Sequence, residues 1–440
     1  MSVANWTLSV EDFGPIKSAS VTLAPFTVFS GRNNTGKSYM ASLIWAVVNA
    51  SELLTRPDAA NVAPFAAAQE LARAILRGDQ SIIDTDGWNK VINWINALLD
   101  DRSVNLPNRV LACADFRSAT SRVSLSAVVP ELRVQWNIVA GPDGVGDKPG
   151  RPRGTGWRYL EDNQTLLITG TPDASNRHID LSLLGTLANC LSGQYGPVIY
   201  IPAARTGLMV ALKSLIAALF GSLDEEEIER RSTLPPPVRY FLADVNSATE
   251  RPNQPHYAIA ETLESEILNG RIIQAENGDF RFAIKGVRTP LPLHAASSLV
   301  TELAPFIVLL KSGIEGALIF EEPEAHLHLD AQRALARVLV RLINTGTPVL
   351  VTTHSDTFLQ QINILMQIFG HTNHDAVAKK FGYRPDELLD PANARGYLFE
   401  ASDGNTVVRE LEKTPLGFVE PAMNETIAKM SHEVIAIGSC

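Results

Sequence analysis

The stretch of sequence that decides the fold is Gly31-Arg32-Asn33-Asn34-Thr35-Gly36-Lys37-Ser38, followed directly by Tyr39. It fits the pattern G-x-x-x-x-G-K-[ST], in which glycines let the backbone curl until successive N–H groups face one phosphate chain. A strand-like apolar run over residues 26–29 precedes it, and apolar residues recur at helical spacing after it. A helix that begins near Lys37 would add the positive end of its dipole to the same anion site.

Two residues of this loop have distinct expected roles toward a nucleotide. Lys37 is expected to hold the β- and γ-phosphates, and Ser38 is expected to ligate Mg²⁺. The rest of residues 31–39 would bind the nucleotide with them. The sequence therefore predicts ATP and Mg²⁺ as cofactors, and a glycine-rich turn without a ligand is the alternative.

A second motif delivers two acids to the end of an apolar strand: Ala317-Leu318-Ile319-Phe320-Glu321-Glu322-Pro323. Ligands of open α/β sheets bind at this end of the strands. We assign Glu321 to the Mg²⁺ shell and Glu322 to the base that accepts a proton from the attacking water. The alternative is a solvated acidic turn.

A third buried strand also ends in polar residues: Val349-Leu350-Val351-Thr352-Thr353-His354-Ser355. His354 is predicted to be catalytic, by reaching a γ-phosphate or the attacking water. A structural histidine at a strand end is the alternative. Because histidines and acids gather in these motifs, a transition-metal site is a minor alternative to Mg²⁺-nucleotide.

The three motifs together resemble the ABC-type P-loop ATPase heads of the OLD, RecF and SMC group. The residues that carry the resemblance are the loop 31–38, the run Glu321-Glu322-Pro323-Glu324-Ala325-His326-Leu327-His328, the turn Thr352-Thr353-His354-Ser355 and the lead-in Val10-Glu11-Asp12-Phe13-Gly14-Pro15-Ile16. Among these proteins the chain is most similar to OLD-like bacterial AAA-type ATPases, without their Toprim nuclease domain. The resemblance covers residues 1–50 and 290–370.

The resemblance implies a dimer of heads, in which a signature helix of one head touches the γ-phosphate held by the other. Ser297 and Ser298 are the expected counterpart, because serine hydroxyls and free N–H groups at a helix start suit an anion. A plain helix cap is the alternative, since Leu299 stands where the family often has glycine. His328 occupies the usual D-loop aspartate position. Arg205 is either an active-site group or half of a structural ion pair.

The alternation of strands and helices predicts an α/β fold. We expect an ABC-type head with a mainly parallel core sheet, an antiparallel N-terminal β part and a large, mostly helical insertion. The expected domains are a discontinuous ATPase core (1–55 with 290–372), an inserted region of mixed β and helix (56–289) that forms an arm or partner-binding lobe, and a small C-terminal hairpin and helix (373–440). Locally we expect a helix over 208–220, a break at Pro235-Pro236-Pro237 and a hairpin around Asn277-Gly278.

Composition sets broad limits. The 440 residues carry a net charge of -10 and are 45% apolar, which is ordinary for a globular protein with two or three structural units. Three widely spaced cysteines (Cys113, Cys190 and Cys440) favour a reducing cytoplasm. We see no signal-peptide pattern and no apolar run of membrane-spanning length, so a cytoplasmic protein with no membrane partner is expected.

The predicted function is Mg²⁺-dependent ATP hydrolysis by a homodimer or higher homo-oligomer assembled through ATP. Its cycle would gate an effector protein (a nuclease or toxin) or a nucleic acid, in anti-phage defence or DNA transactions. The alternative is an OLD-like nuclease subunit acting on DNA, although residues after 372 lack the spaced acids that bind two metals. An ABC transporter subunit and a P-loop kinase fit the motifs less well.

One basic stretch of the sequence is a candidate binding site for nucleic acid. It contains Lys148, Arg151, Arg153 and Arg158, with Trp157 among them. Cations beside an aromatic ring can grip a single strand. A solvated surface loop is the alternative.

Overall fold

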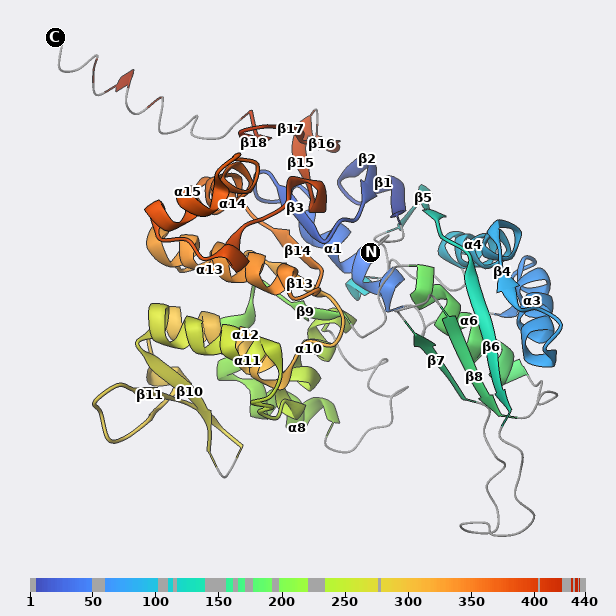
Figure 1. Ribbon diagram of the computed structural model, residues 1–440, viewed down its shortest axis with the longest axis horizontal. Coiled ribbons are helices and arrows are strands. Elements are labelled where there is room, and N and C mark those ends of the chain that lie inside the picture. Colours follow the sequence, from blue (N-terminus) through green and yellow to red (C-terminus); the bar gives the residue numbers. More distant parts are fainter. Residues whose placement is uncertain are drawn as a thin grey trace. The chain divides into compact units, whose positions relative to one another are not determined.

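The structure is a computed structural model, and its elements are labelled in Figure 1. It describes residues 5–49, 60–101, 110–113, 117–138, 156–160, 165–170, 177–191, 198–220, 234–275, 278–402, 404–421, 429, 432–433 and 435. The chain forms two compact units: Met1–Leu23 with Ser42–Val198 is the first, and Ala24–Ala41 with Ile199–Cys440 is the second. Most of the basic stretch, including Lys148, Arg151 and Arg153, and most of the predicted last helix fall outside the described residues.

The first unit contains an antiparallel part and a separate sheet. Strands β1 (Asn5–Phe13), β2 (Ile16–Thr22) and β5 (Arg117–Val128) pair antiparallel in the order β5-β1-β2. The separate sheet has the order β4-β6-β8-β7, formed by Ile82–Ile83, Leu132–Ile138, Thr165–Gly170 and Gly156–Leu160. The α-helices among the described residues of the first unit are α3 (Phe65–Arg77), α4 (Thr85–Asp100) and α6 (Arg177–Leu191). Asp84 starts α4 by accepting a hydrogen bond from the Gly87 N–H at 2.9 Å, an ordinary N-cap.

The second unit is built on a mainly parallel sheet. Its strands run in the order β16-β15-β3-β14-β13-β9, formed by Asn405–Glu410, Ala394–Ser402, Phe26–Ser30, Val349–Thr352, Leu318–Glu321 and Ile199–Ile201. The pairings from β15 through β9 are parallel, and only β16 runs antiparallel to its neighbour. Strands β3, β14, β13 and β9 are buried along their whole lengths, as strands covered on both faces are. The predicted fold class is confirmed.

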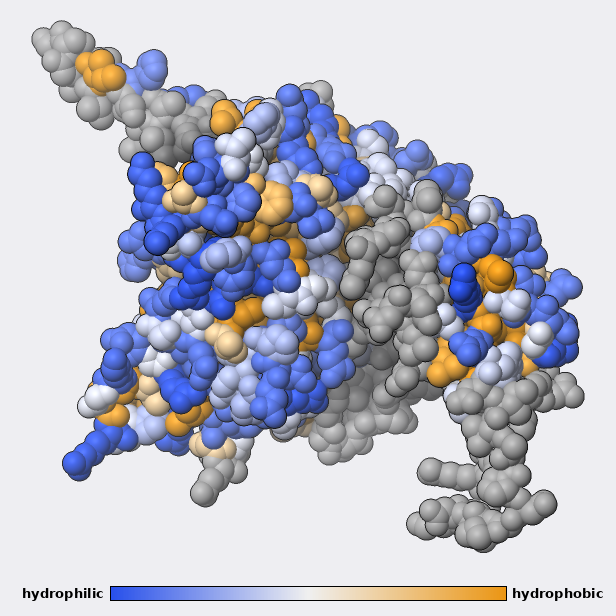
Figure 2. Space-filling model, in the orientation of Figure 1, coloured by the Kyte–Doolittle hydropathy of each residue, from blue (hydrophilic) through white to orange (hydrophobic). Residues whose placement is uncertain are grey.

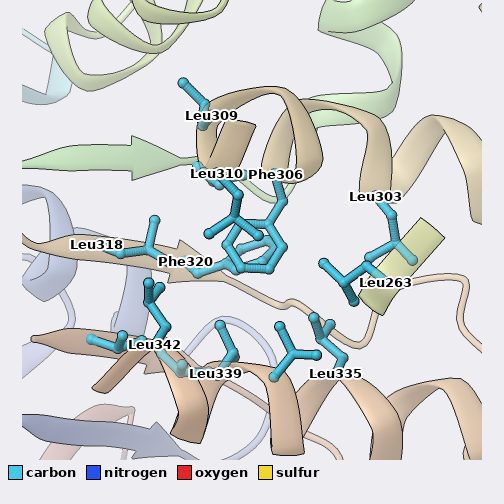
Figure 3. Packing of buried hydrophobic residues seen from close by; sticks show 14 of the residues in the cluster. Leu263, Leu303, Phe306, Leu309, Leu310, Leu318, Phe320, Leu335, Leu339 and Leu342 are labelled. Atoms are coloured by element: carbon cyan, nitrogen blue, oxygen red, sulfur yellow. The ribbon is translucent and has the colours of Figure 1, made fainter. Parts of the chain in front are cut away.

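Helices α12 (Ser298–Ser312) and α13 (Leu329–Asn344) pack on the face of this sheet that carries Phe320. Figure 3 shows Phe320 of β13 among Phe306 and Leu310 of α12 and Leu339 and Leu342 of α13. Other α-helices among the described residues of the unit are α1 (Lys37–Val48, shared with the first unit), α7 (Arg205–Val210), α8 (Leu212–Phe220), α10 (Pro236–Ser247), α11 (Pro255–Leu263), α14 (Asp356–Phe369) and α15 (His374–Phe381). On the face shown in Figure 2, hydrophilic residues cover most of the described surface of this unit, and many of its apolar residues are buried in the core.

Smaller elements complete the second unit. A sheet of β10 (Gly270–Gln274), β11 (Phe280–Ile284) and β12 (Leu291–Pro292) contains the hairpin predicted around Gly278. A π-helix, η3 (Glu264–Leu268), precedes β10, and the hairpin of β17 (Glu412–Thr414) and β18 (Gly417–Val419) follows β16. No helix within the described residues is long and apolar enough to cross a membrane.

Some local expectations differ from the structure. The helix expected over 208–220 is divided into α7 and α8, with Ala211 between them. At the predicted break, Pro235 is the non-helical N-cap of α10 and the next two prolines begin the helix, because proline lacks only an N–H that is unpaired in the first turn anyway. The compact units also divide the chain differently from the expected domains: residues 199–289 lie in the second unit, and β15 pairs with β3 in its central sheet.

Candidate active site

The glycine-rich loop connects the end of β3 to the start of α1. Three of its residues have positive φ: Gly31 at 129°, Asn34 at 61° and Gly36 at 88°. At Gly31 a Cβ atom would lie 2.3 Å from the carbonyl oxygen of Phe399, so only glycine fits there. The Thr35 hydroxyl donates to the Arg32 carbonyl at 2.8 Å and pins the curl of the loop. The predicted strand, loop and helix are therefore present, and the loop is curled as the motif predicts for phosphate binding.

Lys37 lies folded against its own loop. Its side chain is buried, and Nζ donates to the carbonyl oxygens of Gly31 at 2.8 Å and Arg32 at 2.7 Å. Burial lowers the pKa of Lys37, while nearby carboxylates, Glu322 first among them, act in the opposite direction. An ammonium held only by carbonyl dipoles can transfer its hydrogen bonds to phosphate oxygens, which bear full charge.

Glu321 and Ser38 meet, as the sequence predicts for a Mg²⁺ pair. Glu321 ends β13 and is buried; its carboxylate accepts hydrogen bonds from the hydroxyls of Ser38 and Tyr200 and from the Ala203 N–H at 3.2 Å. Burial raises the pKa of Glu321, which these hydrogen bonds oppose. Its Oε1 is buried without a hydrogen-bond partner.

These oxygens fit a hard divalent cation. A buried carboxylate oxygen with free lone pairs, beside a serine hydroxyl, is the donor chemistry that Mg²⁺ takes when phosphates supply further ligands. Among the described residues, no group of three or more His, Cys, Asp and Glu side chains is placed to hold a metal by itself. The donor set therefore suits a cation that arrives together with a nucleotide.

Glu322 follows the strand in an unusual backbone conformation. Its φ is 40°, which non-glycine residues seldom adopt. Its N–H donates to the Thr352 carbonyl at 2.9 Å, continuing the ladder between β13 and β14. The carboxylate is about one-third exposed, at 31%, and its Oε1 lies 3.8 Å from Nδ1 of His354. The two predicted catalytic side chains thus emerge together, one from the end of each strand.

Glu324 shapes the turn that carries His354. It is buried, and its Oε1 accepts hydrogen bonds from the Thr353 hydroxyl at 2.6 Å and from the His354 N–H at 2.9 Å. The imidazole Nδ1 lies 3.6 Å from the same oxygen. Sequence reasoning considered Glu324 only within the acidic run and the minor transition-metal alternative, and it assigned this residue no role in the ATPase site.

The predicted signature residues lie on the surface. Ser297 is the N-cap of α12 without a side-chain capping bond, and Ser298 is the first residue of the helix. Both are exposed, as are Arg32, Asn33, Asn34, Ser38 and Tyr39 of the loop. An uncapped helix start leaves N–H groups for an anion, so contact with a nucleotide held by a second head remains the prediction.

Arg205 and Glu420 complete the surroundings. Arg205 is fully buried and forms a 2.8 Å ion pair with Glu302. Of the two alternatives for this arginine, the pairing supports the structural ion pair over a group that contacts the nucleotide. Glu420 follows β18 and acts electrostatically on Lys37; burial raises its pKa, with Asp356 adding to the effect. Neither Glu302 nor Glu420 carried a motif that sequence reasoning could use.

Comparison with known families agrees with this geometry. Residues 220–360 match the family described as "AAA domain, putative AbiEii toxin, Type IV TA system". The matched region contains the tandem glutamates, His354 and the helix that begins at Ser298. The match is to an AAA-domain family, in agreement with the AAA-type ATPase that the motifs predicted. None of the curated proteins matches the sequence.

Similar solved structures include three SMC head domains. One is a SmcHead bound to the C-winged helix domain of ScpA, with 13% identity over 92% of this chain and 97% of that chain and a TM-score of 0.36. A second, from Pyrococcus furiosus, is an Smc head with an extended coiled coil bound to the C-terminal domain of ScpA, with 13% identity, coverages of 98% and 99% and a TM-score of 0.36. The head from Thermotoga maritima has 10% identity, coverages of 93% and 99% and a TM-score of 0.34.

Proposed function

We propose that this chain hydrolyses ATP with Mg²⁺ and works as a homodimer that sandwiches the nucleotide. The observation that carries the proposal is the meeting of three motifs at one edge of a parallel sheet. Lys37 follows β3, Glu321 ends β13 and Glu322 comes directly after it, and His354 follows β14, which lies between those two strands. Nucleotides bind at this edge in open α/β sheets.

Each side chain has a task in the proposed reaction. Lys37 binds the β- and γ-phosphates and offsets the charge that develops on them. Glu322 orients the attacking water and accepts its proton, and His354 lies close enough to contact the same water or the γ-phosphate. Mg²⁺, held by Ser38 and Glu321, would supply further charge neutralisation at the phosphates.

The second half of the site is proposed to come from another copy of this chain. Ser297 and Ser298 would donate hydrogen bonds to the γ-phosphate held by the partner head. Support comes from their exposure and from the absence of a capping bond at Ser297. Closure around ATP and opening after hydrolysis would then move whatever the heads hold, which we propose to be a nuclease or toxin effector or a nucleic acid, in the cytoplasm during anti-phage defence or DNA transactions.

The test combines turnover with mass. Phosphate release is measured with ATP in the presence of Mg²⁺ and in EDTA, and sedimentation gives the mass with and without a non-hydrolysable ATP analogue. We expect Mg²⁺-dependent release and an analogue-dependent shift from monomer to dimer. Absence of phosphate release would contradict the proposed ATP hydrolysis. A mass that stays the same with the analogue would contradict the proposed dimer.

The partner is sought with a hydrolysis-deficient variant. Glu322→Gln protein is purified from its host with ATP present, and co-purifying material is identified by mass spectrometry and by nuclease treatment. Recovery of one protein that the ATP-free sample lacks would identify an effector, and recovery of DNA or RNA would identify a nucleic-acid partner. The OLD-like nuclease alternative predicts instead that the pure protein cuts DNA with Mg²⁺ or Mn²⁺.

A further inference from the structure

Arg205 is one of the most enclosed charged groups in the described part of the chain. Its side chain has no exposed surface and lies 5.0 Å from the ring centroid of Phe320. The guanidinium Nη1 donates to the Glu321 carbonyl at 3.0 Å, and Nη2 donates to the Glu322 carbonyl at 3.0 Å. One guanidinium therefore holds the backbone of both predicted functional glutamates.

This arrangement explains how the backbone at Glu322 keeps a rare conformation. The parallel ladder between β9 and β13 ends at Phe320, which is paired with Ile201. Beyond that point the guanidinium of Arg205 supplies the donors that a neighbouring strand would supply. A positive φ at a non-glycine residue is strained and persists only where surrounding contacts enforce it. Arg205 on one side and Thr352 on the other provide those contacts.

The same arginine is tied to the helix that carries the predicted signature serines. Nε of Arg205 lies 2.8 Å from Oε2 of Glu302, and both side chains are buried. Glu302 is one turn beyond Ser298 on α12, and its other oxygen accepts a hydrogen bond from the Thr206 hydroxyl. A buried ion pair of this kind resists separation, because an unpaired charge inside a protein is costly.

We infer that Arg205 is a positioning residue: through Glu302 it couples the N-terminal end of α12 to the placement of Glu322. The inference rests on the proposed ATPase function and extends it to the regulation of the same site. Contact of Ser297 and Ser298 with a partner's nucleotide pulls on α12, and Glu302 passes the shift to Arg205 and so to the Glu322 backbone. Hydrolysis is thereby favoured when two heads have closed.

The experiment breaks the link without touching the nucleotide. Glu302→Gln removes the charge and keeps the shape of the side chain, while Arg205→Lys keeps the charge and loses the fork of donors. We expect kcat to fall about tenfold in each variant while the Kd for ATP changes by less than about twofold, because positioning acts on the chemical step. ATP binding is measured separately with a fluorescent nucleotide.

A matched control is available on the same helix. Lys311 of α12 forms a buried ion pair with Glu264 at 2.8 Å, and both side chains are 3% exposed. Glu264→Gln should lower the melting temperature about as much as Glu302→Gln does and leave kcat unchanged. Equal losses of kcat in the two variants would reduce Arg205–Glu302 to an ordinary buried ion pair and overturn the inference.

A double-mutant cycle tests the coupling itself. If Glu302 transmits the effect of the serines, the loss of kcat in a variant with Ser297→Ala, Ser298→Ala and Glu302→Gln is smaller than the product of the separate losses. Multiplicative losses, or wild-type kcat in both Glu302→Gln and Arg205→Lys, overturn the inference and leave the ATPase proposal intact. A wild-type protein that does not hydrolyse ATP overturns both.

Discussion

The hydroxyl of Ser38, in the first turn of α1, donates a hydrogen bond to the carboxylate of Glu321 at the end of β13. The two residues are far apart in the sequence and come from motifs that the sequence alone assigned to one Mg²⁺ site. Their contact ties the phosphate-binding loop to the tandem glutamates before any nucleotide is bound. Several measurable properties depend on this relationship and on its neighbours.

Lys37→Ala is expected to abolish useful ATP binding. The lysine would make charge-assisted hydrogen bonds to phosphate, worth about 1.5–3 kcal/mol each, so losing two of them predicts affinity weaker by about a hundredfold or more. Titration of a fluorescent ATP analogue measures the change. Lys17→Ala is the control, since that lysine forms an exposed ion pair with Asp12 in the first unit. Comparable affinity in the two variants would remove Lys37 from the site.

Glu322→Gln is expected to bind ATP normally and to hydrolyse it about 10²–10⁴-fold more slowly, the usual contribution of a general base. The variant should accumulate as a dimer in ATP, because the dimer opens only after the bound ATP has been hydrolysed. Single-turnover phosphate release and sedimentation measure the two effects. Glu315→Gln, at an exposed ion pair with Arg251, is the matched control. An unchanged turnover rate in Glu322→Gln would exclude it as the base.

Glu321→Gln is expected to stabilise the nucleotide-free protein above neutral pH. The pKa of Glu321 is raised by burial, so its ionisation costs stability as the pH rises from the ordinary value of 4.5 through the folded pKa. Removing the buried charge should therefore raise the melting temperature of the nucleotide-free protein, and this gain should grow as the pH rises above 4.5. ATP with Mg²⁺ should raise the melting temperature of the wild-type protein more than ATP alone does, and the variant should lose most of this difference. A lower melting temperature without nucleotide would contradict this account.

Stability should fall in mild acid because of His256. This buried imidazole accepts a hydrogen bond from the Ile314 N–H at 3.0 Å and lies 3.1 Å from the Thr347 hydroxyl. Burial lowers its pKa from 6.5, so below that pH the unfolded chain takes up a proton that the folded protein refuses. The predicted loss approaches about 1.4 kcal/mol per pH unit until the folded pKa is reached. Urea unfolding at pH 7.5 and 5.5 should show a smaller difference for His256→Gln.

Gly31→Ala is expected to disrupt the phosphate-binding loop. The new methyl group would meet the Phe399 carbonyl, which adds about 1–3 kcal/mol of overpacking to the strain of a positive φ. Gly346→Ala carries similar strain at a φ of 97° but has nothing within 4 Å of the new atom. Comparing the two variants by thermal melting and nucleotide titration isolates the clash. Equal behaviour would mean that the loop accommodates the methyl group.

The sequence predicted those parts of the site whose signals are local. Residues 26–38, 317–323 and 349–355 each contain an apolar strand that ends in polar residues, and the parallel rule places those ends at one edge. The structure brings Lys37, Ser38, Glu321, Glu322 and His354 into that arrangement. The roles assigned to them stay predictions until nucleotide and turnover are measured.

Other features had no local signal. The pairing of β15 with β3 joins segments from the two ends of the chain, and the strand pattern over 394–402 gives no hint of which neighbour it takes. The partner of Arg205 is equally non-local: Glu302 sits within an apolar helix, where its charge could be recognised only once the arginine lay beside it. Such contacts follow from tertiary packing, which propensity and spacing do not describe.

The strand β15 covers one whole side of β3. A fragment that stopped before residue 394 would leave that side as a row of unmet backbone groups, open to strands from other molecules. Shortened versions intended for crystallisation or binding assays should therefore aggregate unless they extend through β16. The hairpin of β15 and β16 would thus shield the edge of β3 from pairing with other molecules, so a fragment chosen by sequence resemblance alone can lack a strand that it needs.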